Sequence, residues 1–388
     1  MKLMPQKNFR CKKCIMDSSI KGILFDSEGV CNFCHLHFLL AQQFPIVKDP
    51  NYIPHKIIEK IKQRGIGKKY DCITGISGGC DSTYTLYLLK KWKLRVLAIH
   101  FNDGWGNPEA GKNITNAVNA LGVDFNVISS DWRESKDIKV ACLKASVPEL
   151  DLGTDLGIAA ALYGAAVKYD IKTIVIGNSF RTEGIMPLEW NFMDGTYLSD
   201  IQKKFGSRPL RLWKADDPGF NLTSKHIVYY IFLKGIKTIP ILSYVPYNKK
   251  EVAEMLSKEV KWQDPGGRYF DDLYQGFMSM VLRTKFNIDF RIPSLAALVR
   301  ENQISYEEAL SQISSKPSNE TERIIELAIQ RLGVTKEEVM QWLKEKPKSF
   351  RDYKTIYPLF KLLRFPVWLF SELSFLPKTA YYKYYKCG

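Results

Sequence analysis

The residues with the clearest chemistry lie in a glycine-rich segment over 75–83, which reads Gly-Ile-Ser-Gly-Gly-Cys-Asp-Ser-Thr. It lies between an apolar run and an apolar-periodic segment, so it joins a predicted strand to a predicted helix. Gly78 and Gly79 would let the backbone approach an anion closely. Ser77, Ser82 and the first N–H groups of the helix would supply donors at the positive end of the helix dipole. The pattern predicts a phosphate-binding loop, and the alternative is an ordinary turn between strand and helix.

Asp81 lies within this loop and carries a charge that does not suit a phosphate site. A carboxylate beside a phosphate is repulsive unless a divalent cation lies between them. We therefore interpret Asp81 as a contact to Mg²⁺, either direct or through water. The Gly-x-x-x-x-Gly-Lys-Ser/Thr spacing of the Walker loop is absent from the sequence, so the pattern indicates a different kind of phosphate loop.

Four of the eight cysteines form two C-x-x-C pairs, Cys11 with Cys14 and Cys31 with Cys34. This spacing can place four thiolates around one tetrahedral zinc ion. Two disulfides or unrelated thiols are the alternatives, and an intracellular chain disfavours disulfides. Four sulfur ligands leave no open position for water or substrate, so the predicted zinc site is structural.

Composition and charge indicate a globular chain that attracts polyanions. It has 388 residues, of which 45% are hydrophobic, and a formal net charge of +15 at pH 7. That charge suits nucleotide-sugars, nucleic acid or an anionic membrane face as partners. The sequence holds no apolar stretch of the roughly eighteen residues that a membrane-spanning helix needs, and its start does not resemble a signal peptide. We therefore expect a cytoplasmic protein.

Strand and helix patterns alternate through the middle of the chain, as a doubly wound parallel α/β sheet requires. The expected strands are 70–76, 95–101, 125–128 and 173–177, and the expected helices are 84–92, 107–121 and 155–169. We expect three parts in all: a zinc-binding module over 1–50, the α/β domain over 51–245, and a helical region with a basic, aromatic tail over 246–388.

Two levels of resemblance to known proteins follow from these motifs. The loop resembles the S-G-G-x-D-S pyrophosphate loop of the ATP pyrophosphatases, a group that contains asparagine, GMP and NAD synthetases and tRNA thiolation enzymes. A narrower resemblance, to the N-acetyl sugar amidotransferases, covers nearly the whole chain. It is carried by the cysteine pairs, the loop, and the segments 100–105, 144–148, 177–184, 246–249, 262–267 and 293–309.

The narrower resemblance implies a PP-loop fold and an enzyme that converts an acetamido group on a bacterial surface sugar into an acetamidino group. Known settings of the family are the O-antigen of lipopolysaccharide and nonulosonic acids such as pseudaminic acid. ATP would transfer AMP to the amide oxygen with the help of Mg²⁺, and ammonia would then displace AMP. The sequence holds no Gly-x-Cys-x-Gly nucleophile elbow and residue 2 is lysine, so we expect a separate glutaminase subunit to supply ammonia.

The candidate site residues follow the expected strands, because ligands of such sheets bind beyond the carboxyl ends where strand order reverses. Their side chains suit hydrogen bonding, ring stacking, anion binding and proton transfer. For several of them the alternatives are loop capping, core packing or a surface ion pair. We assign catalysis to Asp81, Ser82, Asn102 and Glu183, ATP binding to Ser77, Gly78, Gly79, Asp81, Ser82, Gly177 and Asn178, and sugar binding to Asp103, Trp105, Asp155, Arg181 and Arg268.

tRNA thiolation is the main alternative function, because those enzymes share the loop, often carry C-x-x-C pairs and need positive charge to bind RNA. It would require two catalytic cysteines near the adenylate, and Cys80 and Cys142 could act so only if the fold brings them together. A zinc-dependent binding protein with a regulatory ATP loop would leave the polar strand-end segments unexplained. We therefore expect a sugar or nucleotide-sugar substrate and no nucleic-acid partner.

The C-terminal tail over 357–385 interleaves aromatic, aliphatic and basic residues. Residues 344–388 hold ten lysines and arginines but three acidic residues. This composition is also that of a helix at a membrane surface, but a packed terminal helix or a subunit contact is the favoured interpretation, since aromatic stripes usually lie buried within a protein. Before the tail, two capping patterns predict short helices: Ser305 with Glu308, and Thr335 with Glu338.

Overall fold

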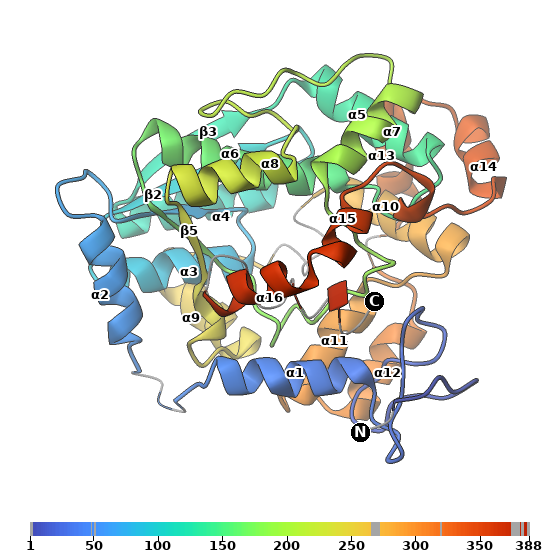
Figure 1. Ribbon diagram of the computed structural model, residues 1–388, viewed down its shortest axis with the longest axis horizontal. Helices are drawn as coiled ribbons and strands as arrows, with labels where there is room; N and C mark the ends of the chain where they lie inside the picture. Colours follow the sequence, from blue (N-terminus) through green and yellow to red (C-terminus); the bar gives the residue numbers. More distant parts are fainter. Residues whose placement is uncertain are drawn as a thin grey trace.

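The computed structural model of the chain describes residues 3–47, 49, 52–264, 272–318, 320–373, 381, 384 and 385. Within those residues, five strands form one parallel sheet in the order β3-β2-β1-β4-β5 (Figure 1). The strands are β1 (Cys72–Gly75), β2 (Val96–Asn102), β3 (Asp124–Ser129), β4 (Thr173–Ile176) and β5 (Lys237–Pro240). After β1, the strands β2 and β3 are added in turn on one side of it. Strand β4 then lies on the other side of β1, and β5 follows beyond β4. Strand order therefore reverses between β1 and β4, and this is the place where ligands of such sheets bind.

Helices cover both faces of the sheet, because alternate side chains of a strand point to opposite faces. In β1, Ile73 belongs to one buried apolar core and Cys72 to the other. One face packs against α3 (Cys80–Lys91), which in turn contacts α4 (Pro108–Leu121) and α9 (Lys249–Val260). The other packs against α6 (Leu152–Lys168), which contacts α5 (Trp132–Lys144) and α7 (Gly195–Phe205). The expected doubly wound parallel sheet is confirmed.

Local sequence explains where the covering helices begin and end. The Asn107 side chain accepts a hydrogen bond from the Glu109 N–H (2.9 Å), Pro108 occupies the first position of α4, and the helix stops at Gly122, whose φ is 56°. Asp131 caps α5 by accepting from the Arg133 N–H at 2.8 Å. The four expected strands are present within a few residues of their predicted ends. Helix α5 and the edge strand β5 were not predicted.

The part of the chain after the sheet is helical, as expected. Its elements are α10 (Tyr274–Val281), η3 (Leu282–Phe286), α11 (Arg291–Arg300), α12 (Tyr306–Ser314), α13 (Glu322–Leu332), α14 (Lys336–Lys344), η4 (Phe350–Asp352), α15 (Tyr357–Leu362) and α16 (Arg364–Glu372). Ser305 caps α12, and Thr335 and Glu338 form the predicted reciprocal capping box of α14. The predicted boundary near residue 245 stays a prediction, and α9 beyond it packs on α3 and α4.

The N-terminal segment lies beside the late helices rather than apart from them. Helix α1 (Asn32–Gln43) runs along α11 and α12 in Figure 1, and the Tyr306 hydroxyl donates to the carbonyl of Cys11 at 3.4 Å. The remaining elements are α2 (His55–Arg64), α8 (Ser224–Val228), η1 (Tyr229–Leu233) and η2 (Ile241–Ser243). Of the helices that the structure describes, none combines the length and the apolar character needed to cross a membrane.

Candidate active site and metal centre

The glycine-rich loop leaves β1 and turns directly against α4. Gly78 has a φ of +85°, which side-chain-bearing residues rarely adopt. A Cβ atom on Gly78 would lie 2.2 Å from the carbonyl oxygen of Ala110 in α4. Both the turn and the close approach of two backbones therefore require glycine at this position.

Side chains from two distant segments hold the loop in this shape. The carbonyl of Gly78 accepts hydrogen bonds from the indole N–H of Trp262 (2.9 Å) and from the amide of Asn113 (3.1 Å). Asn113 also donates to the carbonyl of Gln263 at 2.7 Å and accepts from its N–H at 2.9 Å. Helix α4 and the segment after α9 thus fix the loop, although sequence analysis gave Asn113 and Trp262 no role.

The loop presents its polar groups at the start of α3. The Ser82 hydroxyl accepts from the Ser77 N–H and lies 3.1 Å from the Ser77 hydroxyl, and Ser77 is exposed. Gly79 occupies the position before the helix and offers no side chain to cap it. The first N–H groups of α3 and two hydroxyls therefore face the same exposed place, and an anion there would meet the positive end of the helix dipole.

Asp81 in the first turn of α3 is contacted by two residues beyond the sheet. The Tyr247 hydroxyl donates to one carboxylate oxygen, and the Lys249 ammonium lies 3.3 Å from the other. Burial raises the pKa of Tyr247, so its hydroxyl stays a donor. The expected Mg²⁺ contact at Asp81 stays a prediction. A single carboxylate suits Mg²⁺ when substrate phosphates supply further oxygen ligands.

The loop after β4 lies against the same turn of α3. A Cβ atom on Gly177 would lie 2.8 Å from the Thr85 hydroxyl and 2.9 Å from the carbonyl of Asp81, so the absence of a side chain permits this contact. Asn178 is exposed and donates to Glu183 at 2.9 Å. Asn102 is exposed at the end of β2. The structure thus brings the loops after β1 and β4 together at the switch point, with Asn102 on the neighbouring strand.

Trp105 and Asp103, expected to bind a sugar, are instead buried. Trp105 is 0% exposed, and its ring packs 5.3 Å from Trp132 and 5.1 Å from Tyr274, centroid to centroid. The expectation that it stacks on a substrate ring is corrected, since both neighbours enclose it. Asp103 accepts from the Trp105 N–H (3.1 Å) and from the Thr154 hydroxyl (2.7 Å), which occupies both of its oxygens.

Lys139 lies at the centre of a buried charged cluster under this loop. It is 2% exposed, forms an ion pair with Asp151 and lies 3.5 Å from Asp103. Burial alone would lower the pKa of Lys139, but Asp151, Asp103 and Asp272 raise it, so the lysine stays charged. Burial raises the pKa of Asp272. No sequence signal marked Lys139, because α5 was not predicted and its charges resemble those of an exposed helix.

Arg181, expected to hold an anionic part of the substrate, instead binds a carboxylate of the chain itself. It is 7% exposed and donates to Glu301 at 2.6 Å and to the carbonyl of Phe44 at 2.8 Å. His37 of α1 lies 2.8 Å from the same Glu301 oxygen. This corrects the expected role of Arg181: it joins the loop after β4 to α1 and α11. Asp155 is half-buried in the first turn of α6, and Arg268 lies outside the described residues.

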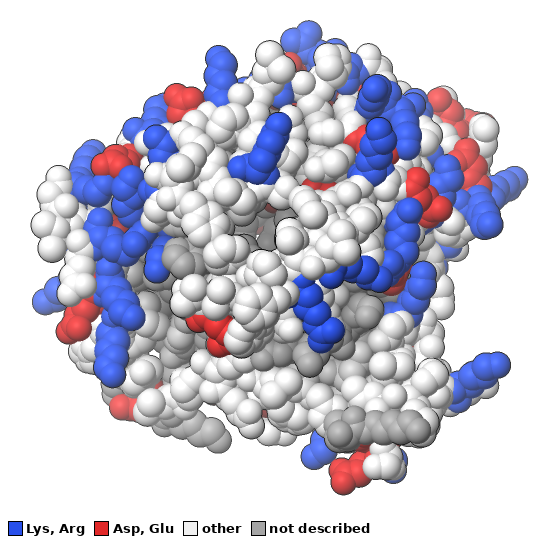
Figure 2. Space-filling view, in the orientation of Figure 1, with Lys and Arg blue, Asp and Glu red and all other residues white. Residues whose placement is uncertain are grey.

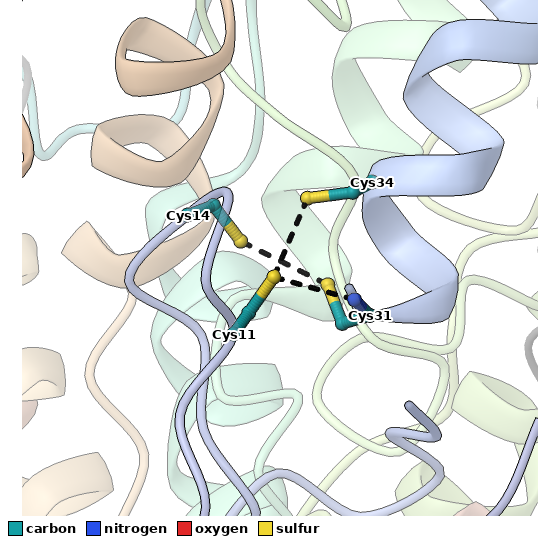
Figure 3. Close-up of side chains that lie close together, drawn as sticks. All are labelled: Cys11, Cys14, Cys31 and Cys34. Carbon is teal, nitrogen blue, oxygen red and sulfur yellow. Dashed lines mark hydrogen bonds between the residues drawn. The ribbon is translucent and has the colours of Figure 1, made fainter. Parts of the chain in front are cut away.

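The four paired cysteines converge on one point between the first loops and the start of α1. Figure 3 shows their sulfur atoms turned toward one another. The sulfur atoms of Cys11 and Cys34 lie 3.7 Å apart and those of Cys14 and Cys31 lie 3.8 Å apart. A tetrahedral zinc ion with Zn–S bonds of about 2.3 Å places its ligands about 3.8 Å from one another. A four-iron cluster spreads its thiolates over four metal ions, so the spacing here fits a single ion.

Arg300 at the end of α11 completes the surroundings of these thiolates. Its guanidinium donates to the sulfur atoms of Cys34 and Cys14, both at 3.2 Å, and to Met16 at 3.1 Å. Hydrogen bonds from outside the ligand set orient ligands and offset their charge. Arg300 and its neighbour Glu301 therefore connect the metal centre and the loop after β4 through adjacent residues of α11.

Structural neighbours of the chain are distant. The NH₃-dependent NAD synthetase of Campylobacter jejuni aligns with 14% identity and a TM-score of 0.32, over 68% of this chain and 96% of that one. The tRNA thiolase NcsA of Methanococcus maripaludis, which holds a 4Fe-4S cluster, gives the same identity and TM-score over 79% of this chain and 89% of that one. Likenesses of this degree bear on neither the substrate nor the reaction.

Sequence comparison identifies the C-terminal region. Over 313 residues the chain is 24% identical to an uncharacterised protein of Methanocaldococcus jannaschii, covering 78% of this chain and 92% of that protein. Residues 267–365 match the family model of the C-terminal domain of WbpG-like LPS biosynthesis proteins. This match agrees with the family resemblance that the motifs indicate, and it shows that the helical region of this chain is similar to the C-terminal domain of the WbpG-like LPS biosynthesis proteins.

Proposed function

We propose that the protein is an ATP-dependent amidotransferase that converts the acetamido group of a bacterial surface sugar into an acetamidino group. The observation that carries the proposal is the contact between the LPS biosynthesis domain and the carboxyl edge of the sheet. The Leu273 N–H donates to the carbonyl of Trp105 at 2.9 Å, and Arg331 donates to the carbonyl of Gly104. The region that matches the LPS biosynthesis domain thus contacts the loop after β2, at the same edge of the sheet as the glycine-rich loop, and this supports a sugar substrate.

The proposed reaction has two steps. First the acetamido oxygen attacks the α-phosphorus of ATP, pyrophosphate leaves, and the amide nitrogen loses its proton, which gives an O-adenylated imidate. Ammonia then attacks the imidate carbon and AMP leaves, carrying the former amide oxygen. The sugar retains its own nitrogen and gains one from ammonia. The first step is needed because an amide oxygen is a poor leaving group, whereas AMP is a good one.

The residues at the switch point suit the first step. The N–H groups at the start of α3 and the hydroxyls of Ser77 and Ser82 would bind the departing pyrophosphate. Asp81 would help to hold Mg²⁺, which would reduce the charge repulsion of the attack. Lys249, already 3.3 Å from Asp81, would add a second positive charge. We assign Asn102, Asn178 and Glu183 to orienting the adenosine, the sugar and the incoming nitrogen.

The source of ammonia and the cellular setting belong to the proposal as well. We expect a separate glutaminase subunit to deliver ammonia, and a nucleotide-sugar of O-antigen or pseudaminic acid synthesis to be the substrate in the cytoplasm.

The placement of the cysteines argues against tRNA thiolation. Cys80 packs against the core on the α3 face of the sheet, whereas Cys142 lies in the core on the α6 face. Burial raises the pKa of Cys80 to about 11 and that of Cys142 to about 12, so neither thiol is activated as a nucleophile. A pair of catalytic cysteines at the loop is therefore not formed by these two residues.

The proposal is tested by incubating the purified protein with ATP, Mg²⁺, an ammonium salt and candidate N-acetylated nucleotide-sugars. Pyrophosphate release should depend on the sugar, and the sugar should lose mass, since NH is lighter than the oxygen it replaces. The same sugar with a free amine in place of the acetamido group should release no pyrophosphate. Without a partner the rate should rise with pH, because ammonia and not ammonium is the nucleophile.

Two variants make the test specific to the loop. Asp81→Asn should abolish sugar-dependent pyrophosphate release while the circular dichroism spectrum stays unchanged. Asp170→Asn is the matched control, because Asp170 is an exposed carboxylate that pairs with lysines near the amino end of β4. If no sugar changes mass while bulk tRNA gains sulfur from a sulfide donor, the proposal is wrong and tRNA thiolation replaces it.

A further inference from the structure

The last two helices that the structure describes expose a dense set of apolar side chains. Leu362 is 84% exposed and Phe365 is 67% exposed, values unusual for such residues in a packed domain. We call this set the apolar face, and its members are Leu359, Leu362, Leu363, Phe365, Trp368, Leu369 and Leu373. Contiguous exposed apolar surface of this kind marks an interaction site.

The apolar face is presented by helices that are anchored on their other side. In α16, Val367 and Ser371 are buried, at 6% and 1% exposure. Trp368 and Leu369 follow Phe365 by three and four residues, so these three side chains share one side of the helix. This side faces away from Val367 and Ser371. The helix therefore uses one stripe of residues to pack on the protein and leaves a second apolar stripe outside.

A distant segment of the chain extends the apolar face. Phe370 of α16 packs edge-on against Phe232 of η1, with centroids 5.2 Å apart. Three apolar residues in and beside η1 are also exposed: Val228 (53%), Phe232 (43%) and Leu233 (76%). Two segments separated by well over a hundred residues thus contribute exposed apolar groups to one continuous surface.

Basic residues accompany these apolar groups. Lys361 and Arg364 are exposed within the two helices, and Lys234 follows η1. In Figure 2 the surface over α15 and α16 is largely white, with Lys and Arg side chains at its edges. Within 357–373 the sequence carries one acidic residue, Glu372.

We propose that the apolar face docks the protein onto an anionic membrane surface. Phe365, Trp368 and the leucines would enter the boundary between headgroups and acyl chains, while Lys361 and Arg364 would meet lipid phosphates. This attachment is reversible and lies in the plane of the membrane. It is independent of the proposed reaction, since none of these residues belongs to the loop or the strand ends.

The charge pattern favours a membrane over a second copy of the chain. A symmetric dimer would place the same face on both subunits, so Lys361 and Arg364 of one copy would approach those of the other. Like charges brought together in this way oppose association. An anionic lipid surface complements both the apolar groups and the basic ones.

Vesicle sedimentation of the full chain tests the proposal. The protein should pellet with phosphatidylcholine vesicles that contain about one third phosphatidylglycerol, and much less with phosphatidylcholine alone, because each basic residue near an anionic surface adds to binding. Changing Phe365→Ser and Trp368→Ser together should weaken binding by about tenfold or more, since two inserted aromatic side chains are lost. A separate variant, Lys361→Gln with Arg364→Gln, should reduce binding to the anionic vesicles and leave the weak binding to neutral vesicles unchanged.

Matched controls are exposed apolar residues elsewhere. Ile66→Ser and Met340→Ser remove side chains that are 75% and 53% exposed but lie outside the apolar face, so vesicle binding should persist. Circular dichroism and ATP-dependent pyrophosphate release verify that each variant is folded. Equal pelleting with neutral and anionic vesicles, or none with either, would overturn the proposal. So would a dimer in light scattering that dissociates in the Phe365 and Trp368 variant, because a second copy would then cover the face.

Discussion

Replacing Gly78 with alanine should damage the candidate site, although the change adds a single methyl group. Gly78 has a φ of +85°, where alanine is strained by about 1–2 kcal/mol. The new Cβ would also lie 2.2 Å from the carbonyl oxygen of Ala110, a backbone atom inside α4 that cannot rotate away. The loop must therefore move.

The size of the effect follows from what the loop would lose. Relieving the contact requires a shift of about 1 Å, and a displacement of that size at a reacting centre costs about a hundredfold in rate. The shift also weakens the bonds that Trp262 and Asn113 donate to the Gly78 carbonyl, each worth about 1 kcal/mol. Together with the backbone strain, we expect the free energy of unfolding to fall by about 2–4 kcal/mol.

The assay is sugar-dependent pyrophosphate release by the Gly78→Ala variant at a temperature where circular dichroism shows it folded. Gly111→Ala is the matched control, because Gly111 lies in the same helix that Gly78 contacts and a Cβ there meets no atom within 4 Å. This control should keep its rate and gain slightly in stability, since alanine favours helix by up to about 1 kcal/mol. A Gly78→Ala enzyme with a normal rate would refute the assignment of the loop to the reaction centre.

Three further predictions concern residues around the two sites. Arg300→Gln should speed zinc transfer to a coloured chelator by about tenfold, because the thiolates of Cys14 and Cys34 lose their hydrogen-bond donor. An unchanged transfer rate would show that Arg300 does not stabilise the metal centre. Lys139→Met should cost about 3–5 kcal/mol in urea unfolding, since buried carboxylates lose their cation, whereas the exposed Lys144→Met in the same helix should cost little. Burial raises the pKa of Cys80 from 9.0 to about 11, so its thiolate fraction at pH 7 to 9 is smaller than that of free cysteine. Peptide mapping should therefore find that Cys80 is alkylated slowly at these pH values and faster toward pH 11. Alkylation of Cys80 as fast as that of free cysteine would contradict this prediction.

The features that sequence analysis placed correctly are those set by local patterns. Parallel strands and their helices appear as alternating apolar segments, and all four expected strands are present. Strand β5 was missed because its four residues include Pro240 and lie at the sheet edge, where a short run has little apolar signal. Helix α5 was missed because charged residues such as Lys139 occupy its buried side.

The site was harder to predict where partners come from distant parts of the chain. The glycine-rich loop was recognisable because its own residues carry the pattern, but the side chains that hold its backbone, Asn113 and Trp262, come from elsewhere in the chain. Arg181 and Trp105 resemble exposed binding residues in the sequence, and they are buried because Glu301 and Tyr274 from the C-terminal region pack on them. Arg300 looked like any charge at a helix end, since nothing in the sequence near it points to cysteines at the start of the chain.

The central claim is that the acetamido oxygen of a sugar is adenylated, and the destination of that oxygen tests it most directly. The substrate is an N-acetylated nucleotide-sugar labelled with a heavy oxygen isotope in its acetamido carbonyl, incubated with the protein, ATP, Mg²⁺ and ammonium. If the acetamido oxygen is adenylated, mass spectrometry will find the label in the phosphate of AMP and none in the amidine product. Unlabelled AMP, or heavy oxygen retained in a sugar that has gained nitrogen, would contradict the account.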